Sequence, residues 1–385
     1  MTIIRHADID KATRLLKTNP VVALLGPRQC GKTTLARQIT EKIKGEIHFF
    51  DCENPREAQR LSDPLTALND LAGVVIIDEI QRVPEIFPVL RVLADREKNV
   101  RYLLLGSASP QLLRQSSETL AGRIAFMELS GFHLENIPAA KTETLWLRGG
   151  FPRSYLADDD AGSFEWRQNF IATFLEKDIP NLGLQIPPRM LHRFWSMLAH
   201  YHGQLFNASE IGRSLGVSDQ TARRYLDLLT ATYMIRETRP WFYNTKKRLI
   251  KSPKIYFRDS GILHALLSIE NKTGLTGHPK LGASWEGFVV EEVIKSLGIR
   301  DNQTYFWGVH TGAEIDLIFE KNGRLYGVEV KHSLAPSVTP SIKTALEELS
   351  LAHVWILYPG KEKYALSDKV TATSLVEFSF KNPGG

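Results

Sequence analysis

The sequence is poor in cysteine, with only Cys30 and Cys52 among 385 residues. Two thiols do not make the disulfide framework of a secreted scaffold, and they favour a reducing cytoplasm. Long apolar runs are missing too, since no stretch approaches the ~18 consecutive apolar residues of a membrane-spanning helix. The opening MTIIRHADIDKATRLL contains acidic residues and lacks the apolar core of a signal peptide. These absences predict a cytoplasmic protein without disulfides or a membrane span.

Neither charge sign dominates the composition. Lysine and arginine number 48 against 43 acidic residues, which gives a net charge of +5 and a pI near 9.0. This small excess permits an anionic partner but does not require one. A chain of this length exceeds one ordinary hydrophobic core, so two or three domains are expected.

A phosphate-binding loop is predicted near the N-terminus. Residues 21–25 (VVALL) have the pattern of a buried strand, GPRQCGKT follows at residues 26–33, and helix-forming residues continue from Lys32. This is G-x-x-x-x-G-K-[ST], whose backbone N–H groups bind phosphates while the lysine reaches the β- and γ-phosphates and Thr33 offers a hydroxyl to Mg²⁺. A chance glycine loop is the alternative, and the flanking strand and helix argue against it. The predicted ATP-binding residues are Gly26, Pro27, Arg28, Gln29, Cys30, Gly31, Lys32, Thr33 and Thr34.

Two further strand patterns support a nucleotide site. Residues 73–78 (GVVIID) end in an acidic pair, as expected of a central parallel strand that brings acids to the carboxyl edge of a sheet. Asp78 would hold Mg²⁺, and Glu79 would act as general base on the attacking water. Residues 100–107 end at Ser107, which would sense the γ-phosphate or cap a helix. Arg123 would stabilise transition-state charge, in cis or from a neighbouring subunit, or form a structural ion pair.

The segments GPRQCGKTT, IIDEIQRVPEIFPVLR, LLLGSAS and LAGR together resemble the AAA-type ATPases that carry a DUF4143 domain at their C-terminus. The resemblance extends over essentially the whole chain. It implies an AAA+-like ATPase core in which Lys32, Thr33, Asp78 and Glu79 fall on the Walker motifs. It also implies a homo-oligomer, a ring or hexamer, in which a neighbour supplies an arginine.

The middle of the chain predicts a helical lid over residues 135–200 and a winged helix over residues 201–270. Residues 208–215 suggest one helix, Gly216 a tight turn and Ser218 the N-cap of a second helix. A basic hairpin then follows. Such a unit suits DNA, with the helix in a groove and the wing on phosphates, but winged helices also bind proteins. The predicted DNA-binding residues are Arg223, Arg224, Lys246, Lys247, Arg248 and Lys251.

Two strands joined by Asn322-Gly323 are predicted near the end of the chain, because this dipeptide is a strong hairpin signal. Alternation places Glu329 and Lys331 on one face, where Asp316 of the partner strand can meet them. Carboxylates in such a cluster can bind a divalent metal, and the lysine can position or activate water.

This arrangement resembles the PD-(D/E)XK nuclease superfamily. Asp316 and Glu329-Val330-Lys331 match its motif, and Glu286 matches the acid often found on the preceding helix, while Ile315 replaces the proline of the superfamily's name. The resemblance implies Mg²⁺ or Mn²⁺ bound by Glu286, Asp316 and Glu329, and phosphodiester cleavage with Lys331. The alternative is a fold that is kept as a binding platform.

The sequence therefore predicts an α/β protein with four parts: a P-loop ATPase domain (1–134), a helical lid (135–200), a winged helix (201–270) and a nuclease-like α/β domain (271–385). Two functions are considered. The first is an ATP-hydrolysing motor that remodels or translocates duplex or branched DNA. The second is a nucleotide-controlled protein-interaction switch whose accessory domains bind protein.

Overall fold

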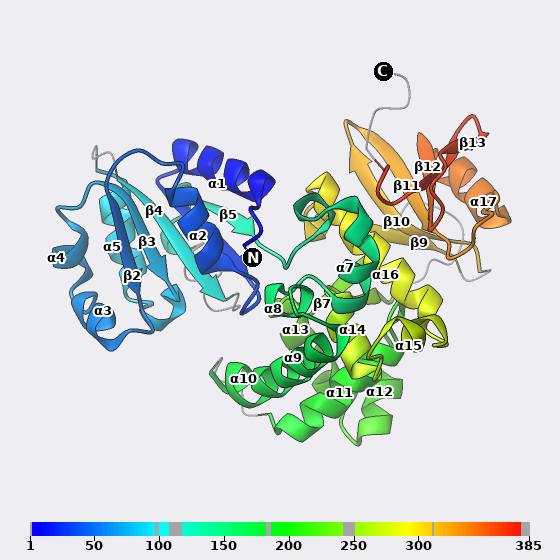
Figure 1. Ribbon diagram of the computed structural model, residues 1–385, viewed down its shortest axis with the longest axis horizontal. Coiled ribbons are helices and arrows are strands. Elements are labelled where there is room, and N and C mark those ends of the chain that lie inside the picture. Colours follow the sequence, from blue (N-terminus) through cyan, green and yellow to red (C-terminus); the bar gives the residue numbers. More distant parts are fainter. Residues whose placement is uncertain are drawn as a thin grey trace. The chain divides into compact units, whose positions relative to one another are not determined.

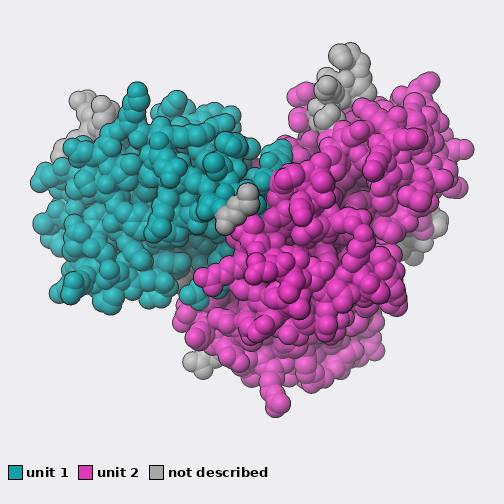
Figure 2. Space-filling view, viewed as in Figure 1, with its two compact units in different colours: residues 1–136, 231–233 teal, residues 137–230, 234–385 magenta. Residues whose placement is uncertain are grey.

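The computed structural model describes residues 2–96, 100–107, 118–181, 186–241, 251–309 and 312–378. The chain divides into two compact units (Figure 2). Unit 1 comprises residues 1–136 and 231–233, and unit 2 comprises residues 137–230 and 234–385. The first boundary lies close to the expected one at residue 134, whereas the three other expected domains fall within unit 2 except for residues 135–136 and 231–233.

Unit 1 is built on a parallel sheet with the spatial order β2-β3-β4-β1-β5 (Figure 1). All four strand pairings are parallel. Near-continuous apolar runs suit such strands, because helices cover both faces of a parallel sheet. The strands are β1 (Val21–Gly26), β2 (Ile47–Asp51), β3 (Gly73–Asp78), β4 (Val100–Ser107) and β5 (Ile124–Glu128). The P-loop ATPase sheet predicted from the sequence is confirmed.

Helix α5 (Ile86–Ala94) of unit 1 buries its apolar face on this sheet. In this helix, Ile86, Phe87, Leu90 and Leu93 recur at helical spacing and join the core formed by β1, β3 and β4. The remaining helices are α1 (His6–Thr18), α2 (Lys32–Thr40), α3 (Pro55–Arg60) and α4 (Pro64–Leu68). A 3₁₀ turn, η1 (Ile80–Arg82), follows β3.

The helices of the expected lid pack inside unit 2. Among the described residues, the range of the lid contains α7 (Thr142–Arg148), α8 (Pro152–Tyr155), α9 (Asp160–Thr173), α10 (Ile179–Asn181) and α11 (Pro188–His200). Three helices that pack with them come later in the chain: α14 (Ser260–Leu266), α15 (Lys272–Thr276) and α16 (Leu281–Leu297). Helices α7, α9, α11 and α16 all contact α14. The buried Arg167 of α9 strengthens this packing, since its Nη1 donates to the carbonyl of Gly261 at 3.0 Å.

A winged-helix order follows: α11, β6 (Gln204–Leu205), α12 (Ala208–Leu215), α13 (Asp219–Ala231), β7 (Ile235–Pro240) and β8 (Lys254–Phe257). Helix α12 ends at Gly216, which has a φ of 73°, as expected of the tight turn. Ser218 Oγ accepts from the backbone N–H of Thr221 at 3.1 Å, so it caps α13 as predicted. Strands β7 and β8 are antiparallel, and of the expected basic wing tip, Lys246, Lys247 and Arg248 lie outside the described residues.

The C-terminal strands are β9 (Tyr305–Gly308), β10 (Glu314–Lys321), β11 (Arg324–Val330), β12 (His353–Tyr358), β13 (Tyr364–Ser367) and β14 (Val370–Ser374), and α17 (Pro340–Glu348) packs against β10 and β12. The predicted hairpin is confirmed: Asn322 and Gly323, with φ of 52° and 70°, join β10 to β11.

These strands are not separate from the winged helix. Strand β9 pairs in parallel with β7, which gives a nine-stranded sheet with the order β13-β14-β12-β11-β10-β9-β7-β8-β6. The expected domain boundary at residue 270 therefore divides one continuous sheet. The sequence did not predict this, because local patterns do not show which distant strands pair with each other. Within the described residues, no helix is both long and apolar enough to cross a bilayer.

Candidate functional site

The predicted phosphate loop connects β1 to α2 at the carboxyl edge of the parallel sheet (Figure 1). Gln29 and Gly31 have positive φ angles of 64° and 101°. Left-handed residues in such a loop turn successive backbone N–H groups into a concave anion site. Gly26 is required by a close approach, because a Cβ there would lie 2.1 Å from the carbonyl oxygen of Leu129. Helix α2 begins at Lys32, and its N-terminal N–H groups add to this concavity.

Lys32 and Thr33 meet the acid of β3 at this edge. Lys32 is buried, and its Nζ donates to the carbonyl oxygens of Gly26 at 3.1 Å and Pro27 at 3.0 Å. Thr33 Oγ1 donates to Asp78 Oδ2 at 2.7 Å. A hydroxyl and a carboxylate from two separate elements are thus within hydrogen-bond distance, next to the loop.

Glu79 and Ser107 lie at the same edge. Glu79 has a left-handed backbone (φ 52°), and its carboxylate accepts a hydrogen bond from Gln81. Ser107 lies opposite Gly26 in the register of β1 with β4. The topology therefore places the predicted water-activating glutamate and the predicted polar sensor around one loop.

Burial raises the pKa of both acids at this edge. For Asp78, the hydrogen bond from Thr33 opposes that effect, and for Glu79 the charge of Lys32 does so. A carboxylate with a raised pKa accepts a proton more readily. The environment of Glu79 thus suits the general-base role predicted for it.

Arg5 is a residue of this site that sequence reasoning missed. Its guanidinium is buried and donates to the carbonyl oxygens of Cys30 at 3.4 Å and Ser130 at 3.0 Å, and its Nε donates to Asp8 at 2.8 Å. Arg5 therefore ties the phosphate loop to the segment after β5. The sequence held no signal for this role, because Arg5 belongs to no motif and its partners are main-chain carbonyls.

The other predicted loop residues differ in exposure. Cys30 is fully buried, and burial raises the pKa of its thiol. Thr34 is exposed, and Arg28 lies 3.8 Å from Glu53. The structure thus gives Cys30 a packing role inside the loop.

Arg123 lies at the opposite edge of the sheet. Its carbonyl accepts from the backbone N–H of Val21, the first residue of β1, whereas the phosphate loop follows the last residue of that strand. Its Nη2 pairs with Asp95 at 2.8 Å. The predicted cis role is corrected by this position, because the length of β1 separates Arg123 from the loop.

The predicted acidic residues of unit 2 do lie near one another. Asp316 and Glu329 adjoin the paired residues Leu317 and Val328 on β10 and β11. The backbone N–H of Val330 donates to Asp316 Oδ2 at 2.8 Å. Lys331 Nζ pairs with Glu329 Oε1 at 2.7 Å, as the predicted shared face requires. Asp316 and Glu329 are both 5% exposed.

A second lysine, which the sequence reasoning placed only in a generic basic hairpin, completes this cluster. Lys254 of β8 is 3% exposed. Its Nζ lies 2.6 Å from Glu314 Oε1, 3.5 Å from Asp316 Oδ1 and 3.6 Å from Glu286 Oε1. Tyr256, two residues further along the strand, donates to Glu286 Oε1 at 2.7 Å. The sequence indicated only that Lys254 and Tyr256, two residues apart on a strand, face the same side. We call Lys254, Tyr256, Glu286, Glu314, Asp316, Glu329 and Lys331 the acid–lysine cluster.

The carboxylates of the acid–lysine cluster perturb one another. Burial and the nearby Asp316 raise the pKa of Glu286 to about 7, and the same two causes raise the pKa of Glu329 to about 8. Burial opposes the charge of Lys254, but Asp316, Glu286 and Glu314 outweigh it and raise its pKa above the ordinary range. Lys254 therefore stays an ammonium ion.

In this arrangement, the predicted metal ligands Glu286, Asp316 and Glu329 lie against lysine ammonium groups. Among the described residues, no three His, Cys, Asp or Glu side chains are arranged to hold a metal ion. Glu286 and Asp316 instead face the ammonium of Lys254, and Glu329 pairs with Lys331. The sequence missed this because Lys254 lies on a strand of the winged helix.

The predicted DNA-binding residues have different fates. Arg223 is neutralised, because its Nε lies 2.9 Å from Asp227 Oδ1 and its Nη2 lies 2.7 Å from Glu237 Oε2. Its role as a phosphate contact stays a prediction. Arg224 and Lys251 are exposed. The expectations for Lys246, Lys247 and Arg248 fall outside the described residues.

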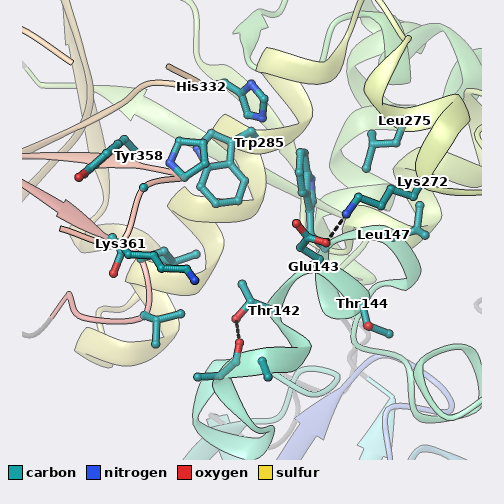
Figure 3. A pocket seen from close by; sticks show the side chains of 18 of the residues that line it. Thr142, Glu143, Thr144, Leu147, Lys272, Leu275, Trp285, His332, Tyr358 and Lys361 are labelled. Atoms are coloured by element: carbon teal, nitrogen blue, oxygen red, sulfur yellow. Dashed lines mark hydrogen bonds and ion pairs between the residues drawn. The ribbon is translucent and has the colours of Figure 1, made fainter. Parts of the chain in front are cut away.

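A pocket of about 680 Å³ lies within unit 2 (Figure 3). Trp285, next to Glu286, and His332, next to Lys331, line it from one side. Lys272 and Glu143 form an ion pair of 2.6 Å on its other side. In α16 and after β11, a residue that lines the pocket is thus the sequence neighbour of a residue of the acid–lysine cluster.

Three family models match the chain in succession. An AAA domain (AAA_14) matches residues 18–137, a domain of unknown function (DUF8612) matches residues 139–273, and a second domain of unknown function (DUF4143) matches residues 281–378. The AAA and DUF4143 matches confirm the resemblance stated from the sequence.

Among solved structures, the chain is similar to the Walker-type ATPase PABY2304 of Pyrococcus abyssi, at 16% identity over 69% of this chain and 96% of that chain, with a TM-score of 0.49. It is also similar to the RuvB Holliday junction branch migration motor of Thermotoga maritima, at 18% identity over 61% and 90%, with a TM-score of 0.31. Both TM-scores lie below 0.5, so the assignment of the fold is based on the strands and helices described above and not on these similarities.

Two curated relatives cover nearly the whole chain. The uncharacterized proteins Rv2008c of Mycobacterium tuberculosis and Mb2031c of Mycobacterium bovis are each 49% identical over 373 residues, which is 97% of this chain and 84% of the relative. The chain therefore belongs to one family with these mycobacterial proteins, and it carries an AAA-type P-loop ATPase domain followed by a C-terminal DUF4143 domain.

Proposed function

We propose that unit 1 binds ATP with Mg²⁺ and hydrolyses it. The observation that carries this proposal is the contact of 2.7 Å between Thr33 Oγ1 and Asp78 Oδ2 beside the phosphate loop. A hydroxyl and a carboxylate are the oxygen donors that P-loop enzymes offer to Mg²⁺, which neutralises phosphate charge when it is bound. Thr33 and Asp78 would hold the ion, directly or through water.

The other residues at this edge have separate roles in the proposal. Lys32 would give up its hydrogen bonds to the loop carbonyls and bind the β- and γ-phosphates instead. Glu79 would orient the attacking water and accept its proton, for which a raised pKa is suitable. Ser107 would orient the water or the γ-phosphate. The supporting observation is that β1, β3 and β4 are neighbours whose carboxyl ends share one edge.

The transition-state arginine in this proposal comes from a second copy of the chain. Arg123 lies at the amino edge of its own sheet, so only another subunit could bring it to an ATP site. Its side chain is 29% exposed despite its pair with Asp95. A ring or hexamer, which the family resemblance suggests, would satisfy this requirement.

We further propose that ATP hydrolysis acts on duplex or branched DNA, which the winged helix of unit 2 would hold. The order α11, β6, α12, α13, β7, β8 and the exposed Arg224 support this proposal. The acid–lysine cluster is a poor surface for phosphates, because its carboxylates outnumber its lysines. We therefore assign DNA binding to α13 and the wing. Cleavage would be assigned to the acid–lysine cluster only if strand breaks are detected.

The test is ATP turnover by the full chain with Mg²⁺, with and without duplex, single-stranded and four-way-junction DNA. Glu79→Gln is expected to lower turnover by about 100-fold or more while ATP binding persists, because it removes the base and keeps the loop. Glu85→Gln, an exposed glutamate of the same segment, is the matched control and should behave like wild type.

The same reactions decide what the ATPase acts on. Stimulation of turnover by one form of DNA supports the motor, and strand breaks that vanish in Asp316→Ala would assign cleavage to unit 2. Turnover that is indifferent to every DNA, with all strands intact, would refute the motor. Normal hydrolysis by Glu79→Gln would refute the assigned base.

One observation favours the second function, a nucleotide-controlled protein-interaction switch. Arg223 of α13 is held by Asp227 and Glu237, so the helix is less basic than its sequence suggests. In this case, Arg224→Ala should leave the dissociation constant for a fluorescent duplex unchanged. Weaker binding of the duplex by Arg224→Ala, with a shallower dependence on salt, would favour the motor.

A further inference from the structure

The acid–lysine cluster contains a cation supplied by the chain itself. Lys254 is carried by β8, whereas its partners come from α16 and β10. Its side chain is 3% exposed, and its ammonium lies within 3.6 Å of three carboxylates, those of Glu286, Glu314 and Asp316. Taking a lysine this far out of water is costly unless such partners compensate it. The cluster is therefore built around a positive charge.

This charge occupies the space between the acids that a divalent ion would need. Mg²⁺ requires oxygen ligands at about 2.0–2.1 Å in near-octahedral geometry. An ammonium that lies 3.5 Å from Asp316 Oδ1 and 3.6 Å from Glu286 Oε1 leaves no room for such an ion between these oxygens. At so short a range, the charge of Lys254 would also repel a dication strongly.

The backbone of Lys254 is fixed in the sheet, which keeps its ammonium between the acids. Its strand β8 pairs with β7, and β7 pairs with β9 of the C-terminal sheet, so the lysine backbone is fixed in the same sheet as Asp316. Its Nζ also lies 5.6 Å from the ring centroid of Phe306, a further favourable contact for a cation. Withdrawal of the ammonium would disturb this ladder.

We propose that Lys254 is the built-in cation of this site, that its ammonium takes the place of a divalent metal, and that the unmodified chain therefore binds no Mg²⁺ or Mn²⁺ between Glu286 and Asp316. The acids keep their metal-binding chemistry, but the chain's own ammonium compensates part of their charge. Removal of the ammonium opens a divalent-cation site. This inference is independent of the ATPase proposal, because the phosphate loop shares no residue with the cluster.

The test is a count of bound Mn²⁺ by the loss of its free electron-paramagnetic-resonance signal, with the full chain and no nucleotide. Four proteins are compared: wild type, Asp316→Asn, Lys254→Met, and Lys254→Met combined with Asp316→Asn. Methionine keeps the length and apolar stem of the lysine and removes its charge. Any Mn²⁺ at the phosphate loop is common to all four and cancels in the differences.

Wild type and Asp316→Asn are expected to bind the same amount of Mn²⁺. Lys254→Met is expected to bind about one additional ion per chain, and adding Asp316→Asn to it should abolish that gain. Binding by wild type that Asp316→Asn removes would overturn the proposal, and this comparison holds even if Lys254→Met does not fold. A folded Lys254→Met, judged by circular dichroism and unchanged ATP turnover, that gains no Mn²⁺ would overturn it too.

Discussion

At the scale of single residues, the buried ion pair of Arg236 and Glu291 joins two elements of unit 2. Both side chains are 2% exposed, and Arg236 Nη2 donates to Glu291 Oε2 at 3.1 Å. Arg236 belongs to β7 and Glu291 to α16, so the pair fixes the winged-helix hairpin to the longest helix of the unit. Breaking a buried pair leaves one charge uncompensated, which costs more than the intact pair contributes.

We therefore expect Arg236→Met to lower the free energy of unfolding by about 3–5 kcal/mol. Arg236→Met combined with Glu291→Leu should recover most of this loss, since the buried carboxylate is removed too, while Asp301, which also contacts Arg236, is half-exposed and keeps Arg258 as a partner. Urea unfolding followed by circular dichroism measures both. Lys272→Met is the matched control, because its pair with Glu143 is exposed on both sides and should matter little. A double variant as unstable as the single one would contradict the explanation.

Residues also mark the limit of prediction from the sequence. The phosphate loop, Asp78-Glu79 and the Asn322-Gly323 turn were predictable, because each is a contiguous motif whose chemistry depends on its immediate neighbours. Lys254 and Arg5 were not, because their partners lie on distant segments that only the fold brings near. Arg223 shows the same limit in part, since its partner Glu237 lies on β7, whereas Asp227, four residues later on the same helix, could be seen in the sequence.

At the scale of elements, α16 approaches the winged helix so closely that Gly287 has no room for a side chain. A Cβ on Gly287 would lie 2.0 Å from His202 Nε2. His202 is held in place, because its Nδ1 accepts from the backbone N–H of Phe257 at 3.0 Å. Burial lowers the pKa of His202 to about 3, so the ring is neutral at physiological pH.

Gly287→Ala is thus expected to lower the free energy of unfolding by about 1–3 kcal/mol, the usual effect of overpacking. Gly282→Ala in the same helix is the control. A Cβ there meets nothing within 4 Å, so alanine should be neutral or slightly stabilising, as its helix propensity suggests. Chemical denaturation compares the two. Equal stability of both variants would show that His202 yields to the added methyl group.

The sequence predicted these elements better than their connections. Helices α12 and α13 and strands β10 and β11 follow from local caps, periodicity and turn residues. The parallel pairing of β7 with β9 does not, because nothing in two short strands specifies a ladder between them. For the same reason, the helices expected as a lid over the nucleotide pack around α14 in unit 2.

At the scale of the whole molecule, the acid–lysine cluster makes stability depend on pH. Burial and Asp316 raise the pKa of Glu286 from an ordinary value near 4.5 to about 7, and that of Glu329 to about 8. Between pH 4.5 and these raised values, Glu286 and Glu329 keep protons in the folded chain that they have lost in the unfolded chain. Stability from these groups is therefore complete below pH 4.5 and falls as the pH rises to about 8.

We expect the free energy of unfolding to decrease from pH 5 to pH 8, and Glu329→Gln to make this slope shallower by at most about 1.4 kcal/mol per pH unit, the value for one proton. Urea denaturation at a series of pH values gives the slope. Glu320→Gln, an exposed glutamate on β10, should leave it unchanged. A slope that is identical in wild type and Glu329→Gln would mean that Glu329 is already ionised at pH 5.

The parallel pairing of β7 with β9 also decides where this chain can be cut. The DUF4143 match begins at residue 281, so a fragment with that boundary retains β9 but loses β7 and β8. Its outermost ladder would then present unpaired N–H and C=O groups to other molecules, which is the usual origin of edge-to-edge aggregation. Its buried Glu286 and Asp316 would also lose the ammonium of Lys254, which compensates part of their charge. A sequence boundary between two named domains is thus not a boundary at which this protein comes apart.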